Sequence, residues 1–299
     1  MTETVAILGC GYVGLELGRE LRAAGVENVV GVRRSAEGVS VIETAGIRGV
    51  QGDVTDPETL ADVPDADVVV FAASAGGSDS TREMYVEGQR TVLEQFGARE
   101  RPPERYIYTS STGVYGDHGG DWVDEETPLE PTTERTRTLV EAERIALDTA
   151  REYGIDGTVA RFAGLYGPGR YRLDRYLDGP VTEGVLNLTH RDDAAGALAF
   201  FVREGCARNE VVLVVDDEPV SKWELADWLA TECQRSTPPK QTKAQHLADD
   251  SLSSAARQRI RAEKRCRNDK LRALGYDLQY PTFRDGYREA IDVAGNSPD

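Results

Sequence analysis

The 299-residue sequence predicts an α/β fold, in which a doubly wound parallel sheet with helices on both faces is followed by a small C-terminal substrate lobe. Short apolar segments of strand length alternate with segments of helical periodicity through the first half of the chain. A glycine-rich turn, "GCGYVG", lies between the first apolar segment and the first helical one. After Gly164 the pattern becomes less regular and richer in turns and arginine, which indicates the lobe.

The individual elements follow from apolar periodicity and from turn residues. The expected strands are residues 4–8, 29–32, 49–51, 68–72, 106–109, 157–162 and 210–215. The expected helices are residues 14–24, 82–98, 134–152, 192–204 and 222–233, with two short ones at 268–274 and 284–293. Residues 235–250 are polar and contain prolines, so we expect a surface loop there.

Gly9, Gly11 and Gly14 form the pattern G-x-G-x-x-G between a strand and a helix. Such glycines permit a tight turn, a close approach of the backbone to a pyrophosphate, and close packing of the helix on the strand. The N-terminus of the following helix then faces the phosphates, and Tyr12 and Val13 of the turn are further candidate cofactor contacts. We therefore predict a Rossmann-type dinucleotide site; the alternative is that the glycines only form a tight turn.

The end of the second strand distinguishes between the two nicotinamide cofactors. NAD-binding proteins usually carry Asp or Glu there for the ribose hydroxyls. This strand runs into Arg33 and Arg34 instead, and arginine suits the 2′-phosphate of NADP. We expect NADP, with NAD possible, although either arginine could simply lie in solvent. Asp53 in "GDVTD" could meet the adenine edge or only stabilise an exposed turn.

The chain is strongly acidic, with 52 Asp and Glu against 35 Lys and Arg and a net charge of −17. This charge argues against nucleic-acid binding through a broad basic surface. The acidic residues are dispersed, and all five lysines lie at or beyond Lys222. Such a surface is typical of salt-adapted, halophilic proteins, although a merely soluble acidic protein would look similar.

The remaining composition argues against several other classes of protein. No apolar segment is long enough to cross a membrane, and the N-terminus lacks a basic-then-apolar leader, so we expect a cytoplasmic protein without a membrane partner. The four cysteines and three histidines are scattered. We therefore expect neither a metal site nor a disulfide framework.

Six motifs occur in the order found in a known superfamily: "GCGYVG", "GDVTD", "VFAASA", "YTSSTGVYG", "ARFAGLYGPGR" and "LTHRDDAAGAL". By these motifs the chain resembles the extended short-chain dehydrogenase/reductases of the nucleotide-sugar epimerase/dehydratase type. The late stretch "KRCRNDKLRALGYDLQYPTFRDGY" resembles an atypical, YeeZ-like branch of that group.

The resemblance implies hydride transfer between a nicotinamide cofactor and a substrate. It implies an NAD(P)-binding Rossmann domain at residues 1–164. Residues 165–299 would supply the remaining strand or strands of the sheet and the substrate lobe, as one structural unit with the first. It also implies cofactor contacts from Ala72 and Ala73, and a homodimer formed through the helices at 82–98 and 134–152.

One part of the catalytic site that the resemblance implies is missing. Ser111 occupies the family position that orients the substrate oxygen. Its family partners are Tyr-x-x-x-Lys on the next long helix, but Arg135 and Leu139 stand at those two positions. Arginine stays protonated in proteins and is a poor proton donor. No tyrosine of the chain has a lysine four residues later.

Three interpretations of this loss are open. In a modified enzyme Tyr115, Tyr166 or His118 could supply the proton, with Tyr115 as the first candidate. Tyr115 could instead only pack at the end of its strand. The protein could also bind NADP without turnover, as a redox sensor or regulator.

Basic side chains indicate an anionic substrate. Arg135, Arg170 and His190 are its candidate ligands, and "YGPGR" would form a loop at the carboxyl edge of the sheet, where ligands bind. Further arginines nearby are Arg137, Arg172, Arg175 and Arg191. The alternative is that these arginines pair with surface carboxylates. We predict an NADP-favouring oxidoreductase or epimerase-like protein acting on a sugar nucleotide or other anionic carbonyl or alcohol compound, with the non-catalytic sensor as the alternative.

Overall fold

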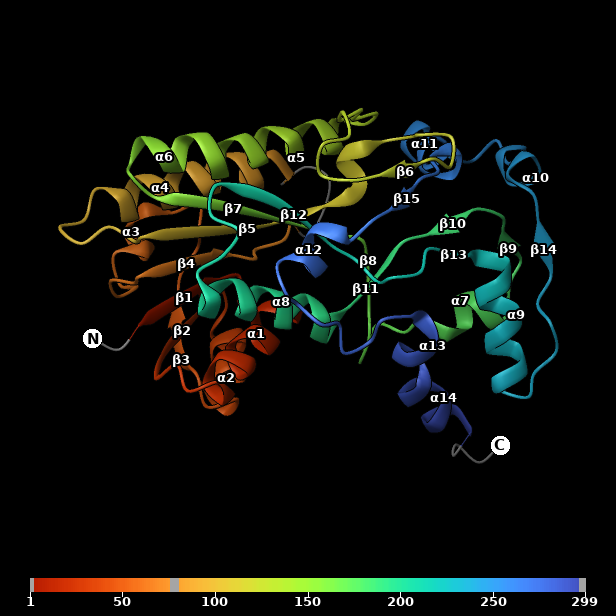
Figure 1. Ribbon diagram of the computed structural model, residues 1–299, viewed down its shortest axis with the longest axis horizontal. Coiled ribbons are helices and arrows are strands. Elements are labelled where there is room, and N and C mark those ends of the chain that lie inside the picture. Colours follow the sequence, from red (N-terminus) through yellow and green to blue (C-terminus); the bar gives the residue numbers. More distant parts are fainter. Residues whose placement is uncertain (1–2, 76–80, 296–299) are drawn as a thin grey trace.

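The computed structural model describes residues 3–75 and 81–295 and confirms the α/β fold with a parallel sheet of seven strands. The strands are β1 (Thr4–Leu8), β2 (Asn28–Arg33), β3 (Arg48–Gln51), β4 (Val68–Phe71), β5 (Arg105–Ser111), β7 (Asp156–Phe162) and β12 (Glu210–Val214). Their order is β12-β7-β5-β4-β1-β2-β3, and every neighbouring pair is parallel. The chain passes from β3 to β4 on the other side of β1, so the strand order reverses there (Figure 1).

Helices cover both faces of this sheet (Figure 1). One face carries η1 (Glu83–Glu87), α4 (Gly88–Gly97), α5 (Glu134–Arg144), η3 (Ile145–Thr149) and α6 (Ala150–Glu152), and the other carries α1 (Tyr12–Ala23), α2 (Ala36–Thr44) and α8 (Arg191–Glu204). Successive residues of a strand point to opposite faces. Accordingly Ala6 and Leu8 lie in the core under the first group, and Val5 and Ile7 lie in the core under the second.

A third hydrophobic core holds the C-terminal lobe together and includes Leu177, Leu225, Leu229 and Phe283. The elements of this part of the chain include β8 (Gly164–Tyr166), α7 (Leu173–Leu177), β9 (Val181–Thr182), β10 (Val185–Leu186), β11 (Leu188–His190), β13 (Val220–Ser221), α9 (Lys222–Glu232), α13 (Phe283–Gly286) and α14 (Arg288–Gly295). The helix α12 (Asp269–Ala273) returns to the sheet, where its Leu271 joins the core under α8.

The region 235–250 differs from the expected loop, because it contains β14 (Lys240–Gln241) and α10 (Lys243–Leu247). A capping box starts α10: the Gln245 amide donates to Thr242 Oγ1 at 3.1 Å, and the Thr242 amide donates to Gln245 Oε1 at 2.7 Å. The helix α11 (Ser254–Arg261), which also was not expected, begins at the capping residue Ser253. Neither helix buries a residue, so apolar periodicity could not reveal them.

Within residues 3–75 and 81–295, no helix combines the length and apolar character needed to cross a membrane.

Candidate functional site

A cleft of about 710 Å³ opens at the carboxyl ends of the sheet strands, where the strand order reverses. Ligands of doubly wound sheets bind at this place. The sequence-predicted site residues that line it are Gly9, Gly11, Tyr12, Val13, Arg33, Arg34, Asp53, Ala72, Ala73, Ser111, Arg135 and Arg170. We call the part around Arg33, Arg34, Ser35 and Asp53 the β2 end. The part around Tyr85, Ser111, Arg135 and Leu139 is the β5 end.

The glycine turn between the two ends leaves no room for side chains. Gly9 has φ +83°, and a Cβ there would lie 2.2 Å from the Cα of Ala73. Gly14 does not line the cleft but supports the turn, since a Cβ there would lie 3.0 Å from the Gly9 carbonyl oxygen. The helix α1 starts with no side-chain cap and no acid in its first turn. Its first amides therefore fit a pyrophosphate.

Arg33 lies against the glycine turn at the β2 end. Its Nη1 donates to the Cys10 carbonyl at 3.2 Å and lies 3.0 Å from where a Cβ of Gly11 would be. Ser35, which sequence reasoning missed, also lines the cleft, and its Oγ accepts from the Gly38 amide at the start of α2. A guanidinium, a hydroxyl and a helix N-terminus together suit a phosphate.

Arg34 and Asp53 lie on the outer rim of the β2 end. The Arg34 side chain is largely exposed, and its Nη1 lies 3.8 Å from Asp53 Oδ2. Asp53 Oδ1 accepts from the amide and the hydroxyl of Thr55 at 3.0 and 2.8 Å. Asp53 therefore stabilises a turn while it also lines the cleft, so the structure retains both interpretations of this residue.

Ser111 ends β5 and lines the opposite end of the cleft. Its Oγ accepts from the Gly113 amide at 3.2 Å, and in residues 3–75 and 81–295 its own proton has no acceptor. Arg135 and Leu139, on α5, line the same end. The positions where the resemblance implies a tyrosine and a lysine thus face the cleft with a guanidinium and an aliphatic side chain.

The structure corrects the suggestion that Tyr115 supplies a proton. Its side chain is fully buried and does not line the cleft. Its hydroxyl donates to the Asp124 carbonyl at 2.6 Å and accepts from Arg161 Nη1 at 2.7 Å, and burial raises its pKa. Arg161 in turn forms a buried ion pair with Glu143 at 2.7 Å. Tyr115 therefore belongs to a packed network beside β5, which is the alternative that the sequence left open.

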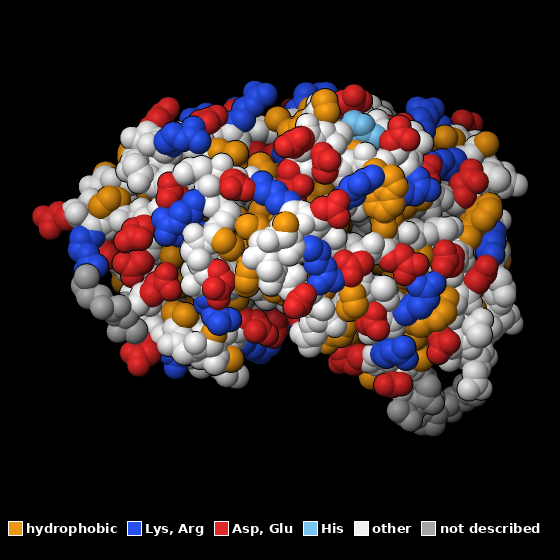
Figure 2. All heavy atoms as spheres, viewed as in Figure 1, with side chains coloured by type: hydrophobic (Ala, Val, Ile, Leu, Met, Phe, Trp, Pro, Cys, Tyr) orange, Lys and Arg blue, Asp and Glu red, His pale blue; other side chains and the backbone are white. Residues whose placement is uncertain are grey.

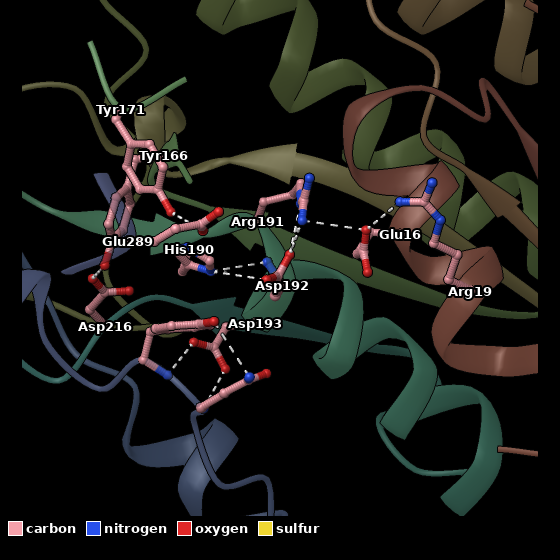
Figure 3. Close-up of polar contacts among 12 residues, drawn as sticks. Glu16, Arg19, Tyr166, Tyr171, His190, Arg191, Asp192, Asp193, Asp216 and Glu289 are labelled. Carbon is pink, nitrogen blue, oxygen red and sulfur yellow. Dashed lines mark hydrogen bonds and ion pairs between the residues drawn. The ribbon is translucent and has the colours of Figure 1, made fainter. Parts of the chain in front are cut away.

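His190 also lies outside the cleft lining, which corrects its expected role as a substrate ligand. It is 1% exposed, and its Nδ1 accepts from the Asp192 amide at 3.3 Å, so that it caps α8 (Figure 3). Burial lowers the pKa of His190 to about 4. The ring is therefore neutral near pH 7 and offers no charge to an anion.

The other proton-donor and substrate candidates are engaged elsewhere or lie away from the cleft. Tyr166 is buried and donates to Asp216 Oδ2 at 3.1 Å. Arg191 points toward Asp192 and Glu16, at 2.7 and 3.4 Å (Figure 3). In the described part of the chain, the cleft lining does not include His118, Arg137 or Arg175.

Four arginines of the cleft have no carboxylate within 4.0 Å in the described part of the chain: Arg33, Arg135, Arg170 and Arg172. The Arg170 guanidinium instead lies 4.0 Å from the centre of the Tyr12 ring. Acidic side chains are spread over the face of the molecule that Figure 2 shows. Unpaired cations gathered in one cleft of a chain with net charge −17 make that cleft attractive to anions.

Sequence reasoning missed Tyr85, which lines the β5 end. It lies in η1, directly after the segment that leaves the end of β4. The available signal was positional: the first turns of a helix that follows a parallel strand lie near the carboxyl edge of the sheet. Among residues 3–75 and 81–295, no group of three or more His, Cys, Asp or Glu could hold a metal ion.

Known proteins resemble this chain in sequence and in fold. The profile of the NAD-dependent epimerase/dehydratase family matches residues 5–199. The chain belongs to this family. This match confirms the resemblance found in the sequence and makes the chain enzyme-like in kind, with an NAD(P)-type cofactor.

Individual relatives of the family match over most of the chain. The protein YeeZ of Escherichia coli K12 is 34% identical over 210 residues, which are 67% of this chain and 73% of YeeZ. A solved structure from Methylobacillus flagellatus, assigned to the NAD-dependent epimerase/dehydratases, is 31% identical and covers 99% of this chain and 100% of its own, with a TM-score of 0.78. The dTDP-glucose 4,6-dehydratase of Bacillus anthracis, solved with NAD, has a TM-score of 0.78 at 19% identity over 97% of this chain and 96% of its own, and shows the fold alone.

Proposed function

We propose that this protein binds NADP in the cleft and acts as an oxidoreductase on an anionic alcohol or carbonyl compound, with sugar nucleotides as one candidate class. The observation that carries the proposal is the set of cleft arginines that have no carboxylate partner among residues 3–75 and 81–295 of so acidic a chain. Arg33 and Arg34 support the preference for NADP, because a guanidinium binds a phosphate with charge-assisted hydrogen bonds.

Each part of the cofactor has a candidate partner in the cleft. The glycine turn and the amides of Tyr12 and Val13 would hold the pyrophosphate, and Ala72 and Ala73 would pack against it. When bound, the nicotinamide would accept or return a hydride. Ser111 would orient the reacting oxygen of the substrate.

The substrate anion would lie among the unpaired cations beside the β5 end. Arg135 lines the cleft at the β5 end, Arg170 lies over the Tyr12 ring beside the glycine turn, and Arg172 adds a third guanidinium to the cleft lining. His190 has no part in this proposal.

Calorimetric titration with NADP⁺, NADPH, NAD⁺ and NADH, in dilute and in molar salt, tests the cofactor. We expect the NADP pair to bind more tightly than the NAD pair. The Arg33→Ala/Arg34→Ala variant should lose at least about 100-fold in NADP affinity, since it removes two charge-assisted bonds of about 1.5–3 kcal/mol each, and little in NAD affinity. Arg48→Ala, at an exposed arginine of β3 outside the cleft lining, is the control for net charge. Tighter binding of NAD than of NADP by the wild type would contradict the proposal.

A second candidate function is a non-catalytic NADP-binding sensor. The aliphatic Leu139 in the cleft favours it, because the family's lysine would stand there. A sensor should distinguish strongly between NADP⁺ and NADPH in the same titrations. Turnover that is lost in Ser111→Ala while nucleotide binding persists would favour the enzyme.

We further propose a cytoplasmic, salt-adapted homodimer formed through α4 and α5. These helices lie side by side on one face (Figure 1). Arg82, which directly precedes η1, donates two hydrogen bonds of 2.6 and 2.8 Å to Glu141 of α5. Screening by salt should favour both folding and association of a chain with net charge −17. Sedimentation that gives only a monomer in molar salt would contradict the dimer.

A further inference from the structure

The β5 end contains one phenol that the family pattern does not assign. In the described part of the chain, Tyr12 and Tyr85 are the tyrosines that line the cleft. Tyr12 belongs to the glycine turn, and its buried hydroxyl lies 3.3 Å from where a Cβ of Gly167 would be, at the base of the loop that carries Arg170. Tyr85 is therefore the phenol available at the β5 end.

A backbone amide and a guanidinium lie beside Tyr85. Its Oη accepts a hydrogen bond from the Ala75 amide at 3.3 Å, and its own proton has no acceptor in residues 3–75 and 81–295. The guanidinium carbon of Arg135 lies 5.8 Å from the centre of its ring. A donated N–H and a permanent positive charge both stabilise a phenolate relative to a phenol.

The Tyr85 backbone is fixed relative to α5. The buried side chain of Gln89 donates from Nε2 to the Tyr85 carbonyl at 2.7 Å and to the Ala142 carbonyl of α5 at 3.3 Å. Gln89 Oε1 also accepts from the Tyr106 hydroxyl at 3.1 Å. These bonds hold η1 and the helix that carries Arg135 in one geometry, as a proton-transfer site requires.

We propose that Tyr85 is the proton-transferring residue of this protein and that Arg135 stabilises its phenolate. The inference rests on the proposed function, because it needs the nicotinamide at the β5 end. If Arg33 and Arg34 hold the 2′-phosphate and the glycine turn holds the pyrophosphate, the second nucleoside extends toward Ser111 and Tyr85.

The proposed proton transfer accompanies hydride transfer in both directions. In oxidation, the C–H bond of a secondary alcohol breaks and its electron pair leaves with the hydrogen as hydride for the nicotinamide. The O–H bond breaks, its proton passes to the Tyr85 phenolate, and the electron pair left on oxygen forms the C=O bond. In reduction, the carbonyl carbon would take the hydride back, the π electron pair of the C=O bond would move to oxygen, and the Tyr85 phenol would return the proton to that oxygen, which Ser111 holds.

The proposed role of Tyr85 can be tested without a substrate, by measuring the protons that are released when the cofactor binds. We would titrate the protein at pH 9 with NADP⁺ and with NADPH by calorimetry, in two buffers of different ionisation enthalpy. The positive nicotinamide of NADP⁺ should favour the Tyr85 phenolate, whereas uncharged dihydronicotinamide should not. We expect NADP⁺ to release measurably more protons than NADPH, because a positive charge beside a phenol makes its ionisation more favourable.

Matched variants assign the released proton. Tyr85→Phe should abolish the difference between the two cofactors and change their affinities less than about threefold. Tyr153→Phe, at an exposed tyrosine outside the cleft lining, should leave the difference intact. Arg135→Gln should reduce the difference, and Arg135→Lys should restore most of it.

Each contrary result has a distinct meaning. Equal proton release in Tyr85→Phe and the wild type would overturn the role of Tyr85 while leaving the proposed function in place. Equal proton release with NADP⁺ and NADPH in the wild type would also overturn the role of Tyr85 and leave the proposed function in place. Failure of every nicotinamide nucleotide to bind would overturn the proposed function, and the inference with it.

Discussion

The two ends of the cleft present different kinds of recognition on one scaffold. At the β2 end and the adjoining glycine turn, the fit to a dinucleotide depends on backbone geometry and on two arginines that follow one another in sequence. At the β5 end, Tyr85, Ser111 and Arg135 come from three different elements. A site built on neighbouring residues leaves one continuous motif in the sequence, whereas a site assembled across elements leaves only separate positions, of which Tyr85 was not recognised.

The β5 end is supported by a buried polar network. Arg161 on β7 binds Glu143 on α5 through two hydrogen bonds of 2.9 and 2.7 Å. Glu143 also accepts from the Ser110 hydroxyl at 2.6 Å, and Tyr115 closes the network on its other side. Because Ser110 lines the cleft, this network fixes the floor beside Ser111. The geometry of the β5 end therefore depends on contacts between residues that are far apart in the sequence.

Breaking this network should give the largest effect. Arg161→Met leaves the carboxylate of Glu143 buried without a cation, which we expect to lower the free energy of unfolding by about 3–5 kcal/mol. Urea unfolding at constant salt measures the loss. Arg208→Met removes the exposed partner of Asp156 at 2.9 Å and should cost less than about 1 kcal/mol. Equal losses in the two variants would show that the network does not support the β5 end in this way.

The sequence allowed most of the sheet to be predicted, because a buried parallel strand is a continuous apolar run such as Val68–Phe71. It also allowed the residues of the glycine turn to be predicted, since their spacing has a backbone cause. It did not reveal α10 and α11, which bury no residue and are marked only by their caps.

The β5 end was less predictable for a physical reason. Tyr115 follows Ser111 by four residues, but the short helical turn between them directs its ring into the core. Tyr85 is 26 positions from Ser111 in the sequence, and only the packing of η1 beside α5 brings it to the same cleft. His190 misled the interpretation because a histidine that caps a helix and one that binds an anion cannot be distinguished by residue type.

A pH titration distinguishes these two roles for His190. Burial lowers the pKa of His190 to about 4 from an ordinary value of 6.5, so the unfolded chain binds its proton more readily than the folded one. Its contribution is therefore present above pH 6.5 and is lost as the pH falls toward 4, by roughly 3 kcal/mol at most.

The matched variant is His190→Asn, which retains a side-chain cap for α8 and removes the titration. Urea unfolding between pH 7 and pH 4 should show a shallower loss of stability in His190→Asn than in the wild type. NADP affinity should be unchanged in both at pH 7, because His190 does not line the cleft. Parallel stability curves for the two proteins would contradict a neutral buried ring.

A pair of glycine substitutions tests whether NADP binding depends on the backbone geometry of the glycine turn. Gly9 and Gly25 both have positive φ, +83° and +91°, so alanine strains the backbone at either position by about 1 kcal/mol. Only at Gly9 would the Cβ meet other atoms, with the Cα of Ala73 at 2.2 Å; at Gly25 it meets nothing within 4 Å. Gly9→Ala should therefore cost a further 1–3 kcal/mol or so of stability from overpacking and lower NADP affinity at least about tenfold. Gly25→Ala should leave NADP affinity unchanged in the same calorimetric titration. A similar loss of NADP affinity in both variants would mean that the glycine turn affects binding through global stability and not through the close approach of its backbone to the cofactor.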